Sequence, residues 1–372
     1  MFITGTYRGS RKLAQNATHE LRDLRQQAVQ MENEITRLRA QWKHELPDPR
    51  VLLSACETAK SKWITSKAEE LNRQLKEQLL QQQLYLASLQ SLVLQSPFLE
   101  ASRSKEVFEA LHTVTKLSAT MTDAQRRERL NAHCDMGLRM VPTIASRFLH
   151  HHVEKATVET PFSHMSIMCD SNFTYVSTLL VCRIPHSSLQ AVTDAVRTYF
   201  ATMHTELKRH VGITGQFTHI EQLGGNKHYA QVRYENGPDL VSTINSTLGL
   251  RVSDDQVIFS TDFIDEDPLH PERKPGDGSI MRDMGLALVM DPVIDQATGQ
   301  HQILMQRICV TRYNLPPNSS LLHYDIQSML QWLNGDLLLK VICQHLAQLQ
   351  LENQQQHLQL THDDAMKRSR HQ

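Results

Sequence analysis

Apolar residues recur at alternating steps of three and four along residues 21–42, which is the spacing of a helix that buries one narrow stripe. Residues of opposite charge, Glu20 with Arg25 and Glu34 with Arg39, stand where the flanking positions of a parallel coiled coil would meet. The pattern predicts pairing with a second copy of the chain or with another helical partner, the alternative being a helix that packs on its own domain. The predicted oligomerisation residues are Leu21, Leu24, Met31, Ile35 and Leu38.

Two prolines interrupt this pattern. Pro47 and Pro49 cannot continue a helix, because each ring removes a backbone donor and disfavours the helical conformation of the residue before it. A second helical run follows over 51–95, where leucines recur among glutamines at helical spacing. The two runs either continue a parallel dimer across the break or fold back as a helical hairpin. Residues 1–15 have little apolar surface to bury, so we predict a disordered lead there.

The hydrophobic period changes after Ser96-Pro97. Residues 100–152 keep helical spacing, whereas 173–184 (FTYVSTLLVCRI) is rich in β-branched and aromatic residues, as strands are. An amphipathic helix follows over 189–207, and the turn at 224–226 (Gly-Gly-Asn) between two strand patterns indicates a hairpin. The other predicted elements are strands at 216–223, 228–235, 257–264, 285–293 and 302–314, an ambiguous segment at 239–250, and a helix at 320–350 with Gly335 as its weak point.

This order of elements predicts an α+β fold in which one long C-terminal helix covers an antiparallel sheet, the helix-grip arrangement. The predicted organisation is a disordered lead at 1–15, coiled-coil helices at 16–97 with a break at 47–49, an α+β domain at 98–351 and a polar tail at 352–372.

Composition narrows the class of protein. The 372 residues carry a formal net charge of -1, which excludes a globally basic nucleic-acid binder. The six cysteines are scattered singly without a CxxC pair, which argues against a zinc site and a disulfide framework. They favour a reducing intracellular compartment, cytoplasmic or nuclear. The sequence shows neither a secretory signal pattern nor an apolar run of membrane-spanning length.

The candidate catalytic and metal-binding motifs are weak. Three adjacent histidines at 150–152 would point about 100° apart on a helix and could not converge on one ion. The acidic stretch 262–267 lacks the alternation and the closing glutamate of a calcium-binding EF-hand loop. Neither a GxSxG elbow nor a phosphate-binding loop is present. We therefore expect a non-enzymatic protein without a metal or a cofactor.

The inward faces of the predicted strands are the remaining candidate site. Alternate residues of the strands at 257–264, 285–293 and 302–314 are apolar, and an apolar small molecule could lie between them and the last helix. Ordinary core packing against that helix is the alternative. His219, with two arginines, could orient a polar head group. The predicted ligand-binding residues are Phe259, Phe263, Leu288, Met305, Arg233 and Arg307.

A family resemblance rests on three stretches: the seam LRDLRQQ, the helical sequence AEELNRQL and the loop IDEDPLHP after a hydrophobic strand. Together with the long α+β region that follows, they resemble a family of oomycete proteins that join a coiled coil to a START-like, lipid-transfer-type domain. The resemblance covers about residues 20–350. It implies a helix-grip fold with a hydrophobic cavity and no reaction.

These observations support three functions from different classes. The first is a non-enzymatic dimer whose coiled coil carries a START-like domain that binds an apolar ligand. The second is a protein-interaction scaffold whose core is filled by its own side chains. The third is a leucine-zipper-type DNA-associated regulator, for which the basic residues before the seam are too sparse to form a dense basic helix.

Overall fold

The chain forms two compact units in the computed structural model, residues 1–76 and residues 77–372. The described residues are 10–45, 48–93, 103–158, 160–170, 172–185, 187–237, 240–272, 280–295, 298–349 and 351–352. The boundary between the units lies inside a helix, earlier than the boundary near residue 97 that the sequence predicts, and Leu80 and Leu84 at the end of that helix are buried in the larger unit.

The first unit is helical. Helix α1 spans Ser10–Glu45 and helix α2 spans Pro49–Val93, so the helix is interrupted where the two prolines predict. Helix α1 begins inside the predicted disordered lead, of which residues 1–9 lie outside the described residues. The seam residues Met31, Ile35 and Leu38 are 60%, 47% and 41% exposed. The side chains of Leu21 and Leu24 lie outside the described part of the chain.

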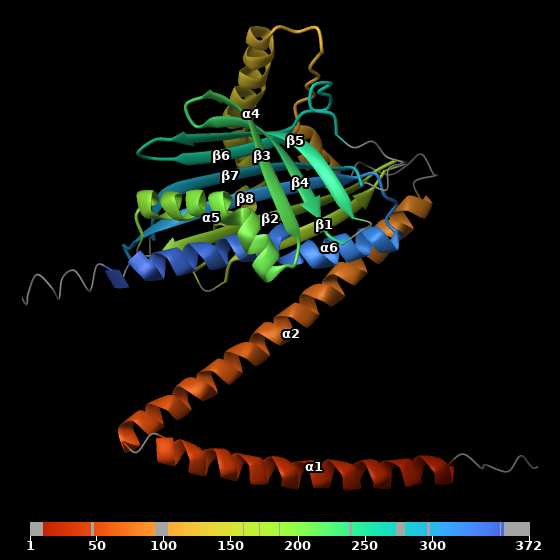
Figure 1. The fold of residues 1–372 in the computed structure, drawn as a ribbon, viewed down its shortest axis with the longest axis vertical. Coiled ribbons are helices and arrows are strands. Elements are labelled where there is room, and N and C mark those ends of the chain that lie inside the picture. Colours follow the sequence, from red (N-terminus) through yellow and green to blue (C-terminus); the bar gives the residue numbers. More distant parts are fainter. Residues whose placement is uncertain are drawn as a thin grey trace, which may run out of the picture. The chain divides into compact units, whose positions relative to one another are not determined.

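The second unit is an α+β domain around one eight-stranded sheet in which every neighbouring pair is antiparallel, in the order β1-β2-β8-β7-β6-β5-β4-β3 (Figure 1). Its helices are α3 (Arg103–Leu111), α4 (Asp123–Val153), α5 (Leu189–His210) and α6 (Ser320–Leu333). Its strands are β1 (Phe162–Cys169), β2 (Thr174–Pro185), β3 (Thr214–Gly224), β4 (Lys227–Glu235), β5 (Val241–Val252), β6 (Val257–Phe263), β7 (Arg282–Ile294) and β8 (His301–Tyr313).

Most elements of this domain agree with the sequence pattern. The predicted strands appear as β2, β3, β4, β6, β7 and β8, and the ambiguous segment at 239–250 is β5. The β3–β4 hairpin turns through Gly225, whose positive φ of 58° suits glycine. Strand β1 is not predicted, because its sequence (FSHMSIMC) mixes polar and apolar residues without a clear period.

The last helix is shorter than predicted. Helix α6 ends at Leu333, Gly335 adopts a φ of 84°, and the chain is helical again over 336–349. A left-handed residue ends a helix because it turns the backbone away from the hydrogen-bonding path, and glycine adopts it without strain. The predicted weak point is therefore a break.

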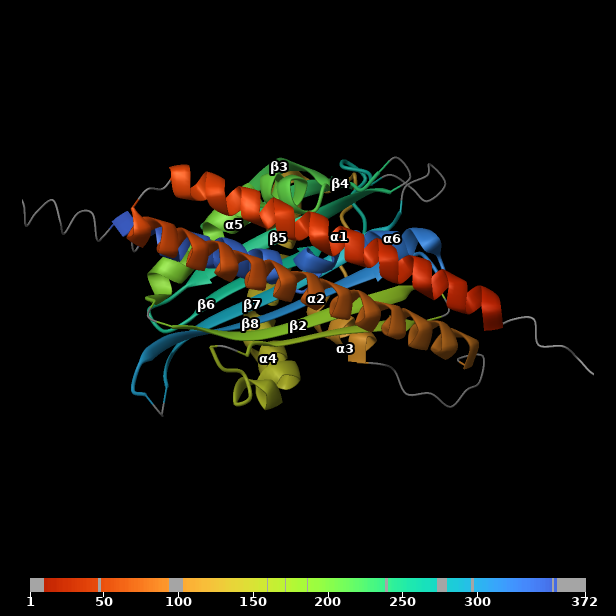
Figure 2. The same ribbon diagram turned by 90° about the horizontal axis from the view of Figure 1, so that it is seen from below.

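Helices cover both faces of the sheet, which corrects the expectation of a single helical lid (Figure 2). Helices α3 and α4 lie on one face, which we call the α4 face. Helix α4 approaches this face closely, because an added Cβ at Gly249 of β5 would lie 2.6 Å from the Cys134 sulfur, and one at Gly137 would lie 2.7 Å from the Ser260 hydroxyl. Burial on both faces explains the nearly continuous apolar run of β2.

The other face, which we call the α5 face, carries α5 and α6. Residue alternation separates the two faces, since Ser177 of β2 contacts Ser104 of α3 whereas the next residue, Thr178, donates to the carbonyl of Leu333 in α6. The fold is compatible with a helix-grip arrangement, with additional helices on the second face. Among the described residues, no helix is both long and apolar enough to span a bilayer.

The apolar spacing within 100–152 also predicts two helical faces, which the structure confirms only in part. They are Phe108, Leu111, Val114 and Leu117 on one face, and Met136, Met140, Ile144 and Phe148 on the other. Helix α3 ends at Leu111, so Val114 is not on its face and is 66% exposed. Met136 and Met140 of α4 are exposed, while Ile144 and Phe148 are buried as predicted. The packing of α4 on the sheet through Gly137 and Cys134 turns a different stripe inward.

Candidate ligand-binding site

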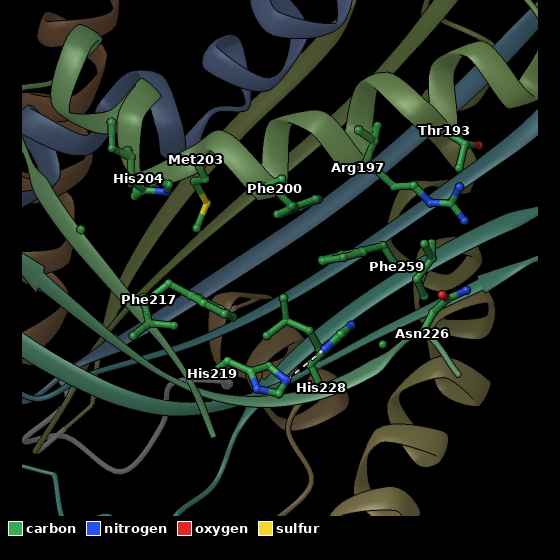
Figure 3. Close-up of a pocket in the computed structure, with 18 of the residues that line it drawn as sticks. Thr193, Arg197, Phe200, Met203, His204, Phe217, His219, Asn226, His228 and Phe259 are labelled. Atoms are coloured by element: carbon green, nitrogen blue, oxygen red, sulfur yellow. Dashed lines mark hydrogen bonds between the residues drawn. The ribbon is translucent and has the colours of Figure 1, made fainter. Parts of the chain in front are cut away.

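A cavity of about 750 Å³ lies between α5 and the half of the sheet formed by β3 to β7 (Figure 3). One wall consists of the inner stripe of α5, including Val196, Phe200, Met203 and Leu207. The opposite wall consists of alternate strand residues, including Phe217, Val232, Tyr234, Leu248, Leu250, Phe259 and Met290. Its volume and its mostly apolar lining are those of a small-molecule site.

The local sequence explains how α5 forms its wall. The Ser188 side chain accepts a hydrogen bond from the Ala191 amide at 3.1 Å and caps the helix. Phe200 then stacks on Phe259 of β6 with ring centroids 4.0 Å apart. Because two aromatic rings separate the helix from the strand here, the smaller side chains on either side of them do not fill the intervening space.

A smaller pocket of about 60 Å³ shares several of these side chains, among them Phe200, Met203 and Tyr234. It reaches further along the α5 face to Leu286 of β7 and Trp332 of α6. The two pockets therefore share an apolar wall, and the inner end of the site approaches the C-terminal end of α6.

Polar side chains gather at the outer part of the large cavity. Arg197, His204 and His219 are exposed, and His228 is half-buried. His219 Nε2 lies 3.4 Å from His228 Nδ1 on the sheet wall (Figure 3). Burial, and then the neighbouring His219, lower the pKa of His228 from its ordinary value, so its imidazole is neutral near pH 7.

Arg197 extends from α5 toward the sheet (Figure 3) and forms an ion pair of 3.3 Å with Asp194 on its own helix. Asp194 does not line the cavity. Among the described residues that line the large cavity there is no Asp, Glu, Ser or Cys. This wall therefore offers hydrogen-bond donors and positive charge, but not the paired nucleophile and base of a hydrolase.

Of the six predicted ligand-binding residues, Phe259 lines the cavity. Leu288 and Met305 are fully buried on the α5 face, by alternation with the neighbouring strand residues, but they do not line the cavity. Arg307 is also on this face, and it donates to the carbonyl oxygens of Leu333 at 2.6 Å and Trp332 at 3.2 Å, so it holds the end of α6.

The other two predicted residues do not lie at the cavity. Arg233 lies between Val232 and Tyr234, which line the cavity, so alternation turns it to the opposite face, where it pairs with Glu235 at 2.6 Å. Phe263 lies beyond the last β6 residue that pairs with β7, although it still pairs with Ser246 of β5, and it stacks on His112 after α3 with ring centroids 3.9 Å apart. Strict alternation along β6 therefore fails at its last residue.

Sequence reasoning missed the residues that α5 contributes. Arg197 and His204 flank the apolar stripe of that helix, and His228 sits on β4 opposite them. Polar residues next to the apolar stripe of a helix are a usable signal, but the same pattern describes any half-exposed helix. His219, considered as a polar group that could orient a head group, does line the cavity.

The α4 face holds a cluster of charged side chains instead of a cavity wall. His112 lies between two carboxylates, 3.0 Å from Asp262 and 3.2 Å from Asp265. The Thr113 and Thr115 amides donate to the same carboxylates at 2.8 and 2.7 Å. Burial alone would lower the pKa of His112, but the hydrogen bonds and charges of the two aspartates raise it to about 9. The acidic stretch at 262–267 is thus partly buried and paired.

Within the described ranges, no cluster of three or more His, Cys, Asp and Glu side chains is arranged to hold a metal ion.

Comparison with known proteins gives little further guidance. No protein-family model matches the chain, and no curated protein matches it. Among solved structures, the crystal structure of human STARD10 matches with a TM-score of 0.34 and 11% sequence identity, covering 60% of this chain and 83% of that chain. A likeness at this level establishes neither a shared ligand nor a family, so the cavity itself is the basis for a functional proposal.

Proposed function

We propose that the protein binds an apolar small molecule in the cavity between α5 and the sheet and holds it without chemical change. The observation that carries this proposal is the volume of about 750 Å³ behind a wall of apolar side chains. It favours ligand binding over a scaffold whose core is filled by its own side chains, because such a scaffold leaves no room of this size. The resemblance to coiled-coil START-like proteins implies a hydrophobic cavity, which agrees with this proposal.

The lining residues support a binding protein over an enzyme, since they lack a carboxylate and a serine or cysteine nucleophile. All six cysteines are free, four of them buried, which supports an intracellular location.

A pair of variants on α5 tests the proposal. Ala201 is exposed and lines the cavity, so Ala201→Trp places an indole in it without disturbing the core. Thr205 is also an exposed position of α5 but does not line the cavity, which makes Thr205→Trp the matched control. We expect the purified full chain to take up a fluorescent fatty acid or sterol saturably, the first variant to lose this uptake and the control to keep it. Absence of saturable uptake by the unaltered protein would refute the proposal.

A second proposal concerns self-association through the seam of α1. Met31, Ile35 and Leu38 expose an apolar stripe that is flanked by charges of opposite sign, as the two helices of a parallel dimer require. Exposed apolar stripes of this kind are typical of interaction surfaces. In this proposal the partner is a second copy of the chain.

Sedimentation of the full-length protein tests this proposal. Ile35→Glu places a carboxylate in the seam, and Val29→Glu places one at a 56%-exposed position outside it. We expect the unaltered chain and the Val29 variant to sediment as dimers and the Ile35 variant as a monomer. A monomeric unaltered chain at high micromolar concentration would refute self-association.

A further inference from the structure

Polarity is distributed unevenly along the large cavity. The exposed or half-buried lining residues include Arg197 and His204 on α5, His219 on β3 and His228 on β4. The deeply buried lining residues are mostly apolar or aromatic and include Leu207, Val232, Tyr234, Phe259 and Met290. Thr193 is the polar exception among the described ones, and its hydroxyl donates to the Leu189 carbonyl of its own helix at 2.6 Å. A ligand that matches this gradient has a polar head at the solvent-facing end and an apolar body inside.

The charges at the solvent-facing end have one sign. Among the described lining residues Arg197 carries the permanent charge, and the other basic side chains are the imidazoles of His204, His219 and His228. Tyr234 stays neutral, because burial raises the pKa of its phenol to about 12. The carboxylate bonded to Arg197 is Asp194, which lies outside the lining. An anionic head group would meet donors on both walls, whereas a cationic one would meet no carboxylate among the lining residues.

The volume limits the size of the ligand. With about 30 Å³ for each non-hydrogen atom, the share of one water molecule in the liquid, a cavity of about 750 Å³ holds about 25 such atoms. A single-chain amphiphile has about this size, and a two-chain phospholipid has about twice as many atoms. The small pocket near Trp332 shares lining residues with the large cavity, so the end of an alkyl chain could extend into it.

We propose that the ligand is a long-chain carboxylate whose head group lies between Arg197 on α5 and the His219–His228 pair on the sheet, with its chain directed along Phe259. This assignment rests on the proposed binding function and specifies its ligand. Arg197 supplies a charge-assisted hydrogen bond from one wall, and the paired imidazoles supply N–H donors from the other.

Three ligands with the same chain and different heads test the head-group assignment: tetradecanoate, tetradecanol and tetradecylamine. Each is added below its aggregation concentration to the purified, delipidated full chain at pH 7, and displacement of a fluorescent apolar probe is measured. We expect the carboxylate to bind about tenfold more tightly than the alcohol, as one charge-assisted hydrogen bond predicts, and the amine to bind more weakly than both. Equal affinity for all three would overturn the head-group assignment and leave the proposed function standing. No binding of any of them would overturn both.

Variants locate the head group. We expect Arg197→Gln, and separately the double variant His219→Gln with His228→Gln, to lower carboxylate affinity about five- to tenfold while alcohol affinity stays unchanged. Unchanged alcohol binding shows that each variant is folded and has an intact cavity. Arg209→Gln removes a charge from the exposed face of the same helix outside the cavity and serves as the control. If that variant weakens carboxylate binding as much as Arg197→Gln does, the carboxylate is attracted by the overall positive charge of the helix and not by a specific head-group site, and the proposal fails.

Discussion

Alternate residues of the same strands meet two different helical layers. On the α4 face, helix α4 lies so close to β5 that a Cβ added at Gly249 would clash with the Cys134 sulfur. His112, directly after α3, contacts Asp262 at the end of β6 and Asp265 in the following loop. On the α5 face, Phe200 and Phe259 hold helix and sheet apart, and a cavity of about 750 Å³ remains. Among the residues that the structure describes, those lining this cavity come from α5, the strands and the β3–β4 turn and not from α3 or α4.

The difference shows that side-chain size and charge placement decide whether a sheet face becomes a core or a binding site. Glycines at the contact between α4 and the sheet let the two backbones come close, so no empty space remains between them. On the other face, the stacked rings of Phe200 and Phe259 keep α5 and the sheet further apart. The α5 face is also closed at one end, where Arg282, Tyr313 and Asn236 bind the carboxylate of Asp325 in α6. A preformed ligand site needs rigid surroundings, and the ion pair and hydrogen bonds of Asp325 fix α6 on the same face of the sheet as the cavity.

The largest effect is expected from breaking this anchor. Asp325→Ala leaves Arg282 buried without its carboxylate, and we expect it to lower the free energy of unfolding by about 3–5 kcal/mol. Glu70→Ala, which removes a half-exposed partner of Arg73 on α2, is the control and should change the stability little, because water and salt screen exposed ion pairs. Urea denaturation followed by circular dichroism measures both, and equal effects would show that the end of α6 is not held by this ion pair.

The charged cluster of the α4 face predicts a pH dependence of stability that is opposite in sign to the one expected from His228 on the cavity face, whose pKa is lowered. The pKa of His112 is raised from 6.5 to about 9, so its stabilisation is complete below about pH 6.5 and is lost as the pH rises through 9. The shift corresponds to about 3 kcal/mol. We expect the stability difference between the unaltered chain and His112→Gln to be largest near pH 6 and to shrink by about this amount by pH 10. A difference that does not change with pH would contradict the paired-aspartate arrangement.

Close approach on the α4 face gives the next largest effect. Gly249→Ala places a Cβ against Cys134 and Leu138, and we expect overpacking to cost about 1–3 kcal/mol. Gly285→Ala in β7 meets its nearest neighbour at 3.7 Å, an ordinary contact, and serves as the control with little loss. Thermal unfolding measures both variants. If Gly249→Ala is as stable as Gly285→Ala, α4 and the sheet are not in close contact.

The smallest effect on stability is expected from a substitution in the large cavity between α5 and the sheet. Ala201→Trp adds a large side chain where space exists, so the free energy of unfolding should change by less than about 0.5 kcal/mol. Chemical denaturation with and without a bound fatty acid checks this, and the stabilisation by ligand should vanish in the variant. A large loss of stability would mean that this region is filled core.

The sequence alone determined most of the elements and their order, apart from strand β1 and the end of α6. The helix break that the two prolines predict lies between α1 and α2, and α2 begins at Pro49, a position where proline is tolerated. The glycine turn at 224–226 produced the β3–β4 hairpin, and periodicity placed α5 and most strands, because these signals act over a few neighbouring residues. Phe259 and His219 were identified as site candidates on this basis, and both line the cavity.

Tertiary structure decided where those elements meet. The second helical layer on the α4 face, the turn of Phe263 toward His112 and the use of Arg307 to hold α6 depend on contacts between residues far apart in the chain. Periodicity gives a residue one of two faces but does not say what covers that face. Whether apolar surfaces close completely or leave a cavity depends on the fit of side chains from separate elements, which no local pattern contains.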